Sequence, residues 1–389
     1  MAPAVVKASA VDLALASYVG DTVAELPTPC LVVDLDRLDA NIARWHSEIQ
    51  RRGKRFRPHI KTHKSPEIAS LQAHAGASGI AVAKVGEAEV FAAAGFDDIV
   101  VAYPVHGEEK WQRLAALARA ARITVNADSP EALRGLSAAA EDAGVEFLVQ
   151  LEIDTGFHRC GVPAEDIDAV EQLARVVLGL PGLDFDGLTT HRGVFFEGSD
   201  AMSIDEAGRE EGRLLTAVAD QLRERGVAVR EVTAGGTISG MGVAEVPGIT
   251  EVRAGTYVFN DLMQLGFGSA RLEDIALTIH CTVISTRVAG QVTIDGGSKT
   301  FSGDRGVVGG AAKASSEVAR GVDGDVVLER ISEEHGMARV EGDRVHIGDR
   351  LAFYPTHACT AVNLSDELFG ARDGVVEKVW PVLARGKRT

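Results

Sequence analysis

The chain has 389 residues, of which 46% are apolar and 25% charged, and its formal net charge is −16. This length suits two domains, or one barrel with an addition, and the apolar content excludes wholesale disorder. The negative charge argues against nucleic acid and anionic membrane surfaces as main partners. Membrane-spanning segments are also excluded, because no apolar run is long enough.

The four cysteines, Cys30, Cys160, Cys281 and Cys359, lie far apart, and no CxxC pair occurs. This pattern is typical of a reducing cytosol rather than of a disulfide framework. Residues 1–25 lack a positive segment followed by a clean apolar core, so we interpret them as an N-terminal tail or helix and not as a signal peptide. We therefore expect a cytoplasmic protein.

The first predicted element is a buried strand, CLVVD at residues 30–34. The apolar residues from Leu35 to Ile49 then recur at spacings of three and four, which predicts an amphipathic helix. Further along, short β-rich runs alternate with helical stretches. The strands predicted in this part are 55–60, 79–83, 98–102, 122–126, 146–153, 184–190, 229–234 and 249–254.

This alternation predicts βα units and a parallel sheet, and eight such units predict a closed (β/α)8 barrel over residues 36–267. The pattern changes after residue 268, where 276–297 and 344–355 are strand-like and separated by turns. Residues 268–389 are thus predicted to form a mostly antiparallel β domain, with a helical stretch first returning at 362–370. Strand 26–35 is expected to join this domain.

The most informative motif is RPHIKTHK, residues 57–64, which follows the first barrel strand. Neighbouring cations disfavour the protonated form of an amine, and the neutral amine of Lys61 can form a Schiff base with an aldehyde cofactor. The alternative is a solvated basic loop, which is the commoner fate of such a run. In a barrel of this kind the active site lies at the carboxyl ends of the strands, where Lys61 is predicted to lie.

Polar and glycine-rich residues follow four other barrel strands. DTGFHRCG with Arg159 follows the fifth strand, His191 the sixth, GGT at 235–237 the seventh, and RAGTY at 253–257 the eighth. Glycine allows backbone N–H groups to approach a phosphate, and threonine adds a hydroxyl donor. Either loop alone is as well explained by a tight turn. Both loops together with Lys61 favour a phosphate-bearing cofactor, and pyridoxal phosphate meets these demands.

A second candidate site is His357-Ala358-Cys359 in the β domain. On a strand, both side chains would point to one face, and imidazole with thiolate suits zinc. The alternative is a half-buried histidine beside an unreactive thiol. A further candidate is Glu333-Glu334-His335, which is equally well explained by a solvated turn. Asp295, Lys299 and Asp304 form another polar cluster, which is interpreted as ordering a loop rather than doing chemistry.

From Leu26 to Val382 the chain resembles the family of D-threonine aldolase and D-serine dehydratase, pyridoxal-phosphate enzymes of fold type III with the alanine-racemase type of fold. The resemblance rests on RPHIKTHK, VGEAEV, EIDTGFHRCGV, RAGTYVFND, DGGSKTFSGD and HACTAVNL. It implies that Lys61 carries pyridoxal phosphate and that Arg253 contacts the ring nitrogen. The other implied site residues are Gly236, Thr237, Gly255 and Thr256 for the phosphate, His59, Arg159, His191 and Tyr257 around the cofactor, and His357 and Cys359 for a divalent metal, zinc or else manganese.

The resemblance implies one of two reactions on a D-β-hydroxy-α-amino acid, and usually a homodimer. In elimination, Lys61 removes the α-proton and the metal helps the hydroxyl leave, giving a keto acid and ammonia. In aldol cleavage, a base such as His63 takes the hydroxyl proton, giving glycine and an aldehyde. As the second metal ligand, a cysteine such as Cys359 is typical of the dehydratase branch, whereas the aldolase branch typically has an aspartate. Residues 360–364, however, resemble aldolase-like members of the family. An amino-acid racemase and a non-catalytic cofactor carrier are the alternatives of other classes.

Overall fold

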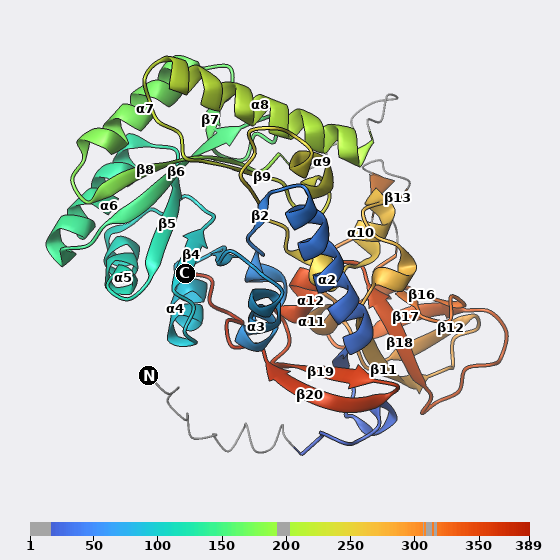
Figure 1. Ribbon diagram of the computed structural model, residues 1–389. Helices are drawn as coiled ribbons and strands as arrows, with labels where there is room; N and C mark the ends of the chain where they lie inside the picture. Colours follow the sequence, from blue (N-terminus) through green and yellow to red (C-terminus); the bar gives the residue numbers. More distant parts are fainter. Residues whose placement is uncertain (1–16, 193–202, 306, 309–312, 315–316) are drawn as a thin grey trace.

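Two large sheets organise the described residues of this protein (Figure 1). The structure is a computed structural model, and it describes residues 17–192, 203–305, 307–308, 313–314 and 317–389. Most of the expected N-terminal tail, residues 1–16, lies outside these ranges. Within them, no helix combines the length and apolar character needed to cross a bilayer.

The first sheet is parallel and contains all eight predicted barrel strands, in the order β2-β10-β9-β8-β6-β5-β4-β3. Its two ends meet where Ala81 N–H donates to the Pro58 carbonyl at 2.9 Å, beside a bridge between His59 and Ala81. The predicted (β/α)8 barrel is confirmed, with a short unpredicted strand, β7 (Val162–Pro163), beside β6. The strands are β2 (Arg55–Phe56), β3 (Ile80–Val82), β4 (Asp98–Val101), β5 (Arg122–Ala127), β6 (Phe147–Asp154), β8 (Leu183–Thr190), β9 (Glu231–Ala234) and β10 (Glu251–Val252).

Helices cover the outside of this barrel (Figure 1). The predicted amphipathic helix is α2 (Leu35–Arg51), whose apolar stripe is buried and whose first turn is capped by the Asp34 carboxylate, which accepts from the Arg37 N–H at 3.0 Å. The others are α3 (Pro66–His74), α4 (Val85–Ala93), α5 (Glu108–Ala118), α6 (Pro130–Ala143), α7 (Ile167–Gly179), α8 (Ile204–Glu224) and α9 (Gly240–Ala244). A further helix, α10 (Leu262–Phe267), lies beside the β domain, where the Met263 N–H donates to the Thr356 carbonyl at 3.1 Å.

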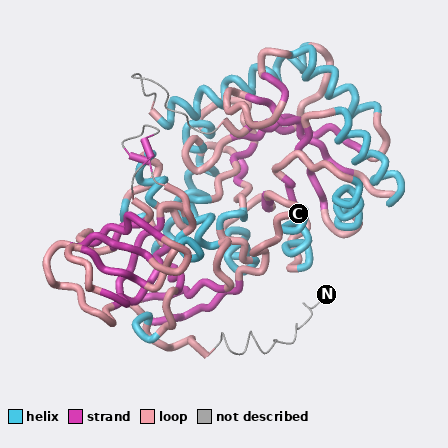
Figure 2. Tube along the Cα trace, turned by 180° about the vertical axis from the view of Figure 1, so that it is seen from behind, coloured by secondary structure: helices cyan, strands magenta, loops and turns pink. Residues whose placement is uncertain are grey.

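The second sheet is mostly antiparallel and lies to one side of the barrel (Figure 2). Its order is β12-β17-β16-β15-β18-β11-β1-β19-β20, and because β12 also pairs with β11, the strands from β12 to β11 close into a small barrel. The strands are β1 (Cys30–Asp34), β11 (Leu277–Ser285), β12 (Gln291–Ile294), β15 (Ala319–Gly321), β16 (Val326–Ile331), β17 (Gly336–Val340), β18 (Arg350–Pro355), β19 (Glu367–Arg372) and β20 (Val375–Pro381). A separate pair is formed by β13 (Val307–Val308) and β14 (Lys313–Ala314).

The N-terminal strand β1 inserts into this second sheet, antiparallel to β11 and parallel to β19. The prediction of a helix at 362–370 is wrong. A short helix, α12 (Ala358–Val362), ends where that helix was expected to begin, and 367–372 is strand β19. The physical reason is non-local, since β1 offers residues 369–371 a partner that the local sequence does not reveal.

The last residues return from β20 to the barrel, and the C-terminus lies beside α4 (Figure 1). Ala384 is buried among barrel side chains, and its N–H donates to the Lys64 carbonyl at 3.1 Å. The chain end is held where the Gly86 N–H donates to the Thr389 carbonyl at 2.8 Å. The two parts of the molecule are therefore connected on the side where RPHIKTHK lies.

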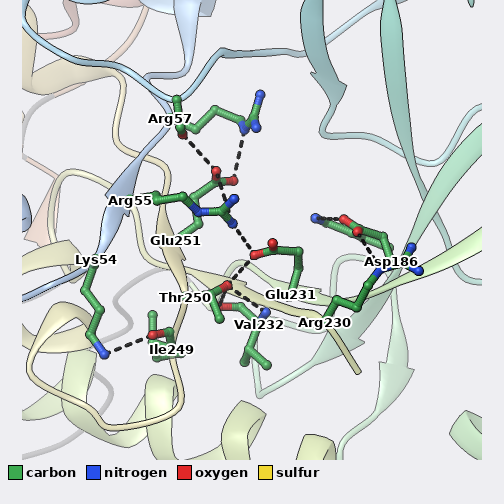
Figure 3. Close-up of polar contacts among 12 residues, drawn as sticks. Lys54, Arg55, Arg57, Asp186, Arg230, Glu231, Val232, Ile249, Thr250 and Glu251 are labelled. Carbon is green, nitrogen blue, oxygen red and sulfur yellow. Dashed lines mark hydrogen bonds and ion pairs between the residues drawn. The ribbon is translucent and has the colours of Figure 1, made fainter. Parts of the chain in front are cut away.

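Ion pairs close the barrel at the amino ends of its strands (Figure 3). Arg57 donates to Glu251 at 3.0 Å and to Asp98 at 2.7 Å, and both Arg57 and Glu251 are buried. Nearby, Arg230 lies 3.4 Å from Asp186. Ion pairs thus link residues at the amino ends of several barrel strands.

We predict that Arg57→Met lowers the free energy of unfolding by about 3–5 kcal/mol, because it removes the buried cation from the buried carboxylate of Glu251, to which the neutral Ser78 hydroxyl still donates at 2.9 Å. The matched control is Arg122→Met, since Arg122 also pairs with Asp98, at 3.6 Å, but its side chain is 54% exposed. That exposed pair is expected to contribute less than about 1 kcal/mol. Urea unfolding of both variants makes the comparison, and equal losses would contradict the prediction.

Candidate active site

A cavity of about 830 Å³ lies at the carboxyl ends of the barrel strands. Loops after the barrel strands form most of its wall, and the turn between β18 and α12 of the β domain completes it. The predicted site residues that line it are His59, Lys61, Arg159, His191, Gly236, Thr237, Arg253, Gly255, Thr256, His357 and Cys359.

Lys61 lies in a short 3₁₀ turn, Ile60–Thr62, that directly follows the extended residues after β2. The buried Ile60 anchors this turn, while the Lys61 side chain is exposed to the cavity. The loop after β10 packs closely against it. A Cβ at Gly255 would lie 2.7 Å from the His59 carbonyl oxygen and 3.1 Å from Thr62 Oγ1. Only glycine fits there, and this close approach brings Thr256 beside the lysine loop.

The loop after β9 is a tight turn of small residues beside the cavity. Gly235 has φ +87°, a conformation that favours glycine. The Gly236 N–H donates to Ser239 Oγ at 3.4 Å, and Thr237 Oγ1 accepts from the Tyr257 N–H at 3.1 Å. The loops after β9 and β10 are therefore tied together, and their small residues leave room for an anionic group such as a phosphate.

The cavity is positively charged. Burial, reinforced by the charge of Lys61, lowers the pKa of His59 well below its ordinary value and lowers the pKa of His191 to about 3. Both imidazoles are thus neutral near pH 7. The buried Arg253 donates to Thr189 Oγ1, but its Nε and Nη1 have no partner among the described residues. A bound anion and a ring acceptor would satisfy these donors, so the residues present fit pyridoxal phosphate.

His357 and Cys359 also reach the cavity, but not from a strand as expected. Strand β18 ends at Pro355, and Asp261 accepts from the Ala358 N–H at 2.9 Å, which turns the chain into α12 with His357 at its N-cap. His357 Nδ1 lies 2.6 Å from Asp304, and Cys359 Sγ lies 3.2 Å from Thr62 Oγ1. The side chains converge because of this helix start, not because of strand alternation.

Each member of this pair favours the charged form of the other. Burial alone would lower the pKa of His357, but its hydrogen bond with Cys359 and the nearby carboxylates raise it to about 10. Burial alone would raise the pKa of Cys359, but His357 holds it below the ordinary value. A thiolate is the form that binds metal. The described chain contains no cluster of three or more histidine, cysteine or acidic side chains suited to a metal, so a metal here would have two protein ligands.

His63 and Tyr257 do not line the cavity, unlike the other predicted residues. Both are fully buried and contact Gln72, which donates to the Tyr257 hydroxyl at 2.8 Å and whose Oε1 lies 3.2 Å from His63 Nε2. For His63 the reason is the 3₁₀ turn Ile60–Thr62, because side chains two positions apart in such a turn, here Lys61 and His63, point in different directions. His63 is therefore not placed to exchange a proton with a molecule in the cavity.

Several residues that line the cavity were missed. They could have been found by applying the strand-end rule to the second, third and fourth barrel strands as well, since Lys84, Tyr103 and Asn126 stand at or just after their carboxyl ends. Asp304, interpreted from sequence as loop-ordering, instead contacts His357 directly. The other missed lining residues include Asp128, Glu152, Ser239 and Gln264.

Glu211 on α8 contacts two loops of the site, and no sequence pattern indicated this role. It is fully buried on α8 and accepts from the Arg192 N–H at 3.3 Å and from the Gly235 N–H at 3.2 Å. Burial raises its pKa, while these bonds and one from Ser239 lower it. One carboxyl group thereby ties the loop carrying His191 to the glycine loop after β9.

We expect Glu211→Leu to lower the free energy of unfolding by about 2–5 kcal/mol, because it leaves two buried backbone donors without an acceptor. Glu211→Gln keeps an acceptor oxygen and should lose less. The control is Asp220→Leu on the same helix, where the side chain is 66% exposed. Chemical denaturation compares the three variants, and a loss at Glu211→Leu no larger than the control would show that Glu211 does not hold the loops.

Comparison with protein families matches two parts of the chain. Residues 33–262 match the alanine racemase N-terminal domain, and residues 276–371 match a putative serine dehydratase domain. The chain is 35% identical over 356 residues to D-threo-3-hydroxyaspartate dehydratase of Delftia sp. (strain HT23), covering 87% of this chain and 92% of that protein. It is also 35% identical over 374 residues to D-threonine aldolase of Arthrobacter sp., and this match covers 94% of this chain and 95% of that protein.

Solved structures agree with these relatives. D-threonine aldolase from Filomicrobium marinum superposes with a TM-score of 0.86 at 30% identity, covering 95% of this chain and 98% of that one. The Delftia dehydratase superposes with a TM-score of 0.85 at 33% identity, covering 93% and 98%. Two structures of D-threo-3-hydroxyaspartate dehydratase variants also match, one with alanine for a histidine and one with alanine for a cysteine two positions later, and the cysteine variant is described as metal-free.

Proposed function

Because the chain belongs to the family of D-threonine aldolase and D-serine dehydratase, we propose that it eliminates water from a D-β-hydroxy-α-amino acid to give a keto acid and ammonia. The chain is a pyridoxal-phosphate-dependent lyase acting on D-hydroxyamino acids. The observation that carries the proposed elimination is that His357 and Cys359 lie in the same cavity as Lys61. The D-threo-3-hydroxyaspartate dehydratase of the variant structures has a histidine and a cysteine at the same spacing.

Lys61 is the proposed attachment point for pyridoxal phosphate, which when bound supplies an electron sink at the α-carbon of an amino acid. Its Nζ would then hold or release the α-proton. Gly236, Thr237, Gly255 and Thr256 would bind the phosphate. The unpartnered donors of Arg253 would face the ring nitrogen, and His59, Arg159 and His191 would complete the cofactor shell.

His357 and Cys359 are the proposed metal ligands, and their soft nitrogen and sulfur donors favour zinc, with manganese as the alternative. A metal there would act as a Lewis acid on the β-hydroxyl group of the substrate. Asp304 accepts from the Nδ1 side of His357, which leaves Nε2 as the metal-binding nitrogen. His63, expected from sequence as a possible base, is too deeply buried for that role.

Aldol cleavage to glycine and an aldehyde is the second candidate, because two of the similar proteins are D-threonine aldolases. A racemase would share the fold but would need no metal, so it would leave His357 and Cys359 without a role, and a non-catalytic cofactor carrier would need only a barrel. We further propose a homodimer, from the family resemblance, and a cytoplasmic location, because all four cysteines are free thiols.

Product analysis with D-threonine and D-serine tests the proposal on protein loaded with pyridoxal phosphate and zinc. From D-threonine, 2-oxobutyrate and ammonia are expected, whereas glycine and acetaldehyde would favour the aldolase.

Lys61→Ala should abolish both the visible absorbance of the bound cofactor and turnover, because no other lysine amine is proposed to form the Schiff base. Retained absorbance in that variant would show that Lys61 is not the attachment point.

Cys359→Ala is expected to weaken zinc binding by more than about 100-fold, since even partners outside the first ligand shell contribute 10–100-fold. Bound pyridoxal phosphate should be unchanged while activity falls. Cys160→Ala is the matched control, because Cys160 lines the same cavity but contacts Glu152 at 3.0 Å instead of His357. Competition with a chelator measures the affinity, and equal zinc binding by the two variants would place the metal elsewhere.

A further inference from the structure

Part of the cavity wall has no role in the proposed function. The proposed cofactor and metal residues follow β2, β6, β8, β9 and β10 or belong to the β18–α12 turn. The wall after β3, β4 and β5 is left, and its polar residues are Lys84, Tyr103, Asn126 and Asp128. This wall adjoins Lys61, because β3 neighbours β2 where the barrel closes.

Lys84 is the distinctive residue of this wall. Its ammonium lies 3.7 Å from the centroid of the Tyr103 ring, which is a cation–π contact. In the part of the chain with described coordinates, Lys84 makes no ion pair. The neighbouring Arg159, by contrast, lies 3.4 Å from Glu152. The ring therefore positions the charge of Lys84 without neutralising it.

The acidic side chains near Lys84 are engaged elsewhere. Glu87 accepts from the Ala83 N–H at 2.6 Å and from the Lys84 N–H at 3.2 Å, and it pairs with Lys64 at 3.2 Å. Asp128 accepts from the Gly161 N–H at 3.0 Å. Glu87 thus fixes the backbone of Lys84 while Lys64 balances its charge, and an anion from solution can still bind the Lys84 ammonium.

We propose that Lys84, supported by Tyr103, binds a carboxylate of the substrate. The inference rests on the proposed function, in which every substrate carries an α-carboxylate and some carry a second one on the side chain. The other cations of the cavity, Lys61, Arg159 and Arg253, are assigned to the cofactor, which leaves Lys84 to balance this charge.

The relative positions support the same assignment. Cys359 contacts Thr62 after β2 and lies 3.6 Å from Thr256 after β10, so the metal ligands approach Lys61 from the β10 side. Lys84 approaches from the β3 side. A substrate whose hydroxyl group faces the metal ligands would direct a carboxylate on the opposite flank toward Lys84.

Lys84→Met in the holoenzyme tests the proposal. Zinc and pyridoxal phosphate contents should stay unchanged, while KM for D-threonine or D-threo-3-hydroxyaspartate rises roughly 10- to 100-fold, as expected for a lost charged hydrogen bond. Lys84→Arg should restore part of the affinity. Lys110→Met, on α5 and away from the cavity lining, is the control. Equal rises for the two substrates assign the α-carboxylate, and a rise larger for the dicarboxylic substrate assigns the side-chain carboxylate.

Binding of malonate to the holoenzyme, measured by calorimetry, separates this inference from the proposed function. If neither hydroxyamino acid is consumed by the unchanged protein, the proposed function is wrong, yet malonate still reports on Lys84. A weaker malonate affinity in Lys84→Met supports the carboxylate site. A malonate affinity within about twofold of the unchanged protein, with an unchanged KM, overturns it.

Discussion

The packing of the β18–α12 turn against the loop that carries Lys61 is the contact on which the site depends. Cys359 Sγ meets Thr62 Oγ1 at 3.2 Å, and Asn363 accepts from the Lys64 ammonium at 2.7 Å. Lys64 is buried in a left-handed conformation, φ 53°, and also pairs with Glu87. Such a strained and buried lysine persists only where its surroundings hold it. Those surroundings come from both parts of the molecule, so barrel and β domain form the site together.

Charge explains why this cavity suits an anionic cofactor. The carboxylates in its lining contact other groups, as Glu152 does Arg159 and Asp128 the Gly161 N–H, while Arg253 keeps two donors without partners among the described residues. His59 and His191 remain neutral because desolvation, reinforced by the charge of Lys61, lowers the pKa of both. A bound phosphate would therefore relieve the repulsion among these cations. At the amino ends of the strands, by contrast, Arg57 and Glu251 neutralise each other.

Much of this arrangement was predictable from the sequence. The barrel strands are buried on both faces, so they read as short apolar runs, and the polar residues after them must meet at one end. Residues set by turns were harder. His63 and Lys61 are two positions apart, but the 3₁₀ turn sends them to different surroundings. His357 and Cys359 converge through a helix start that Asp261, almost a hundred positions away, completes.

The eight-stranded barrel, the position of Lys61 at a strand end and the family resemblance follow from the order of residues alone, because apolar periodicity and motifs are local properties of the chain. The pairing of β1 with β11 and β19, the contact of Glu211 with two loops and the position of Lys84 over the Tyr103 ring became visible in the folded molecule. Each of these depends on residues far apart in sequence, and their contacts exist only once the strands have closed into barrels.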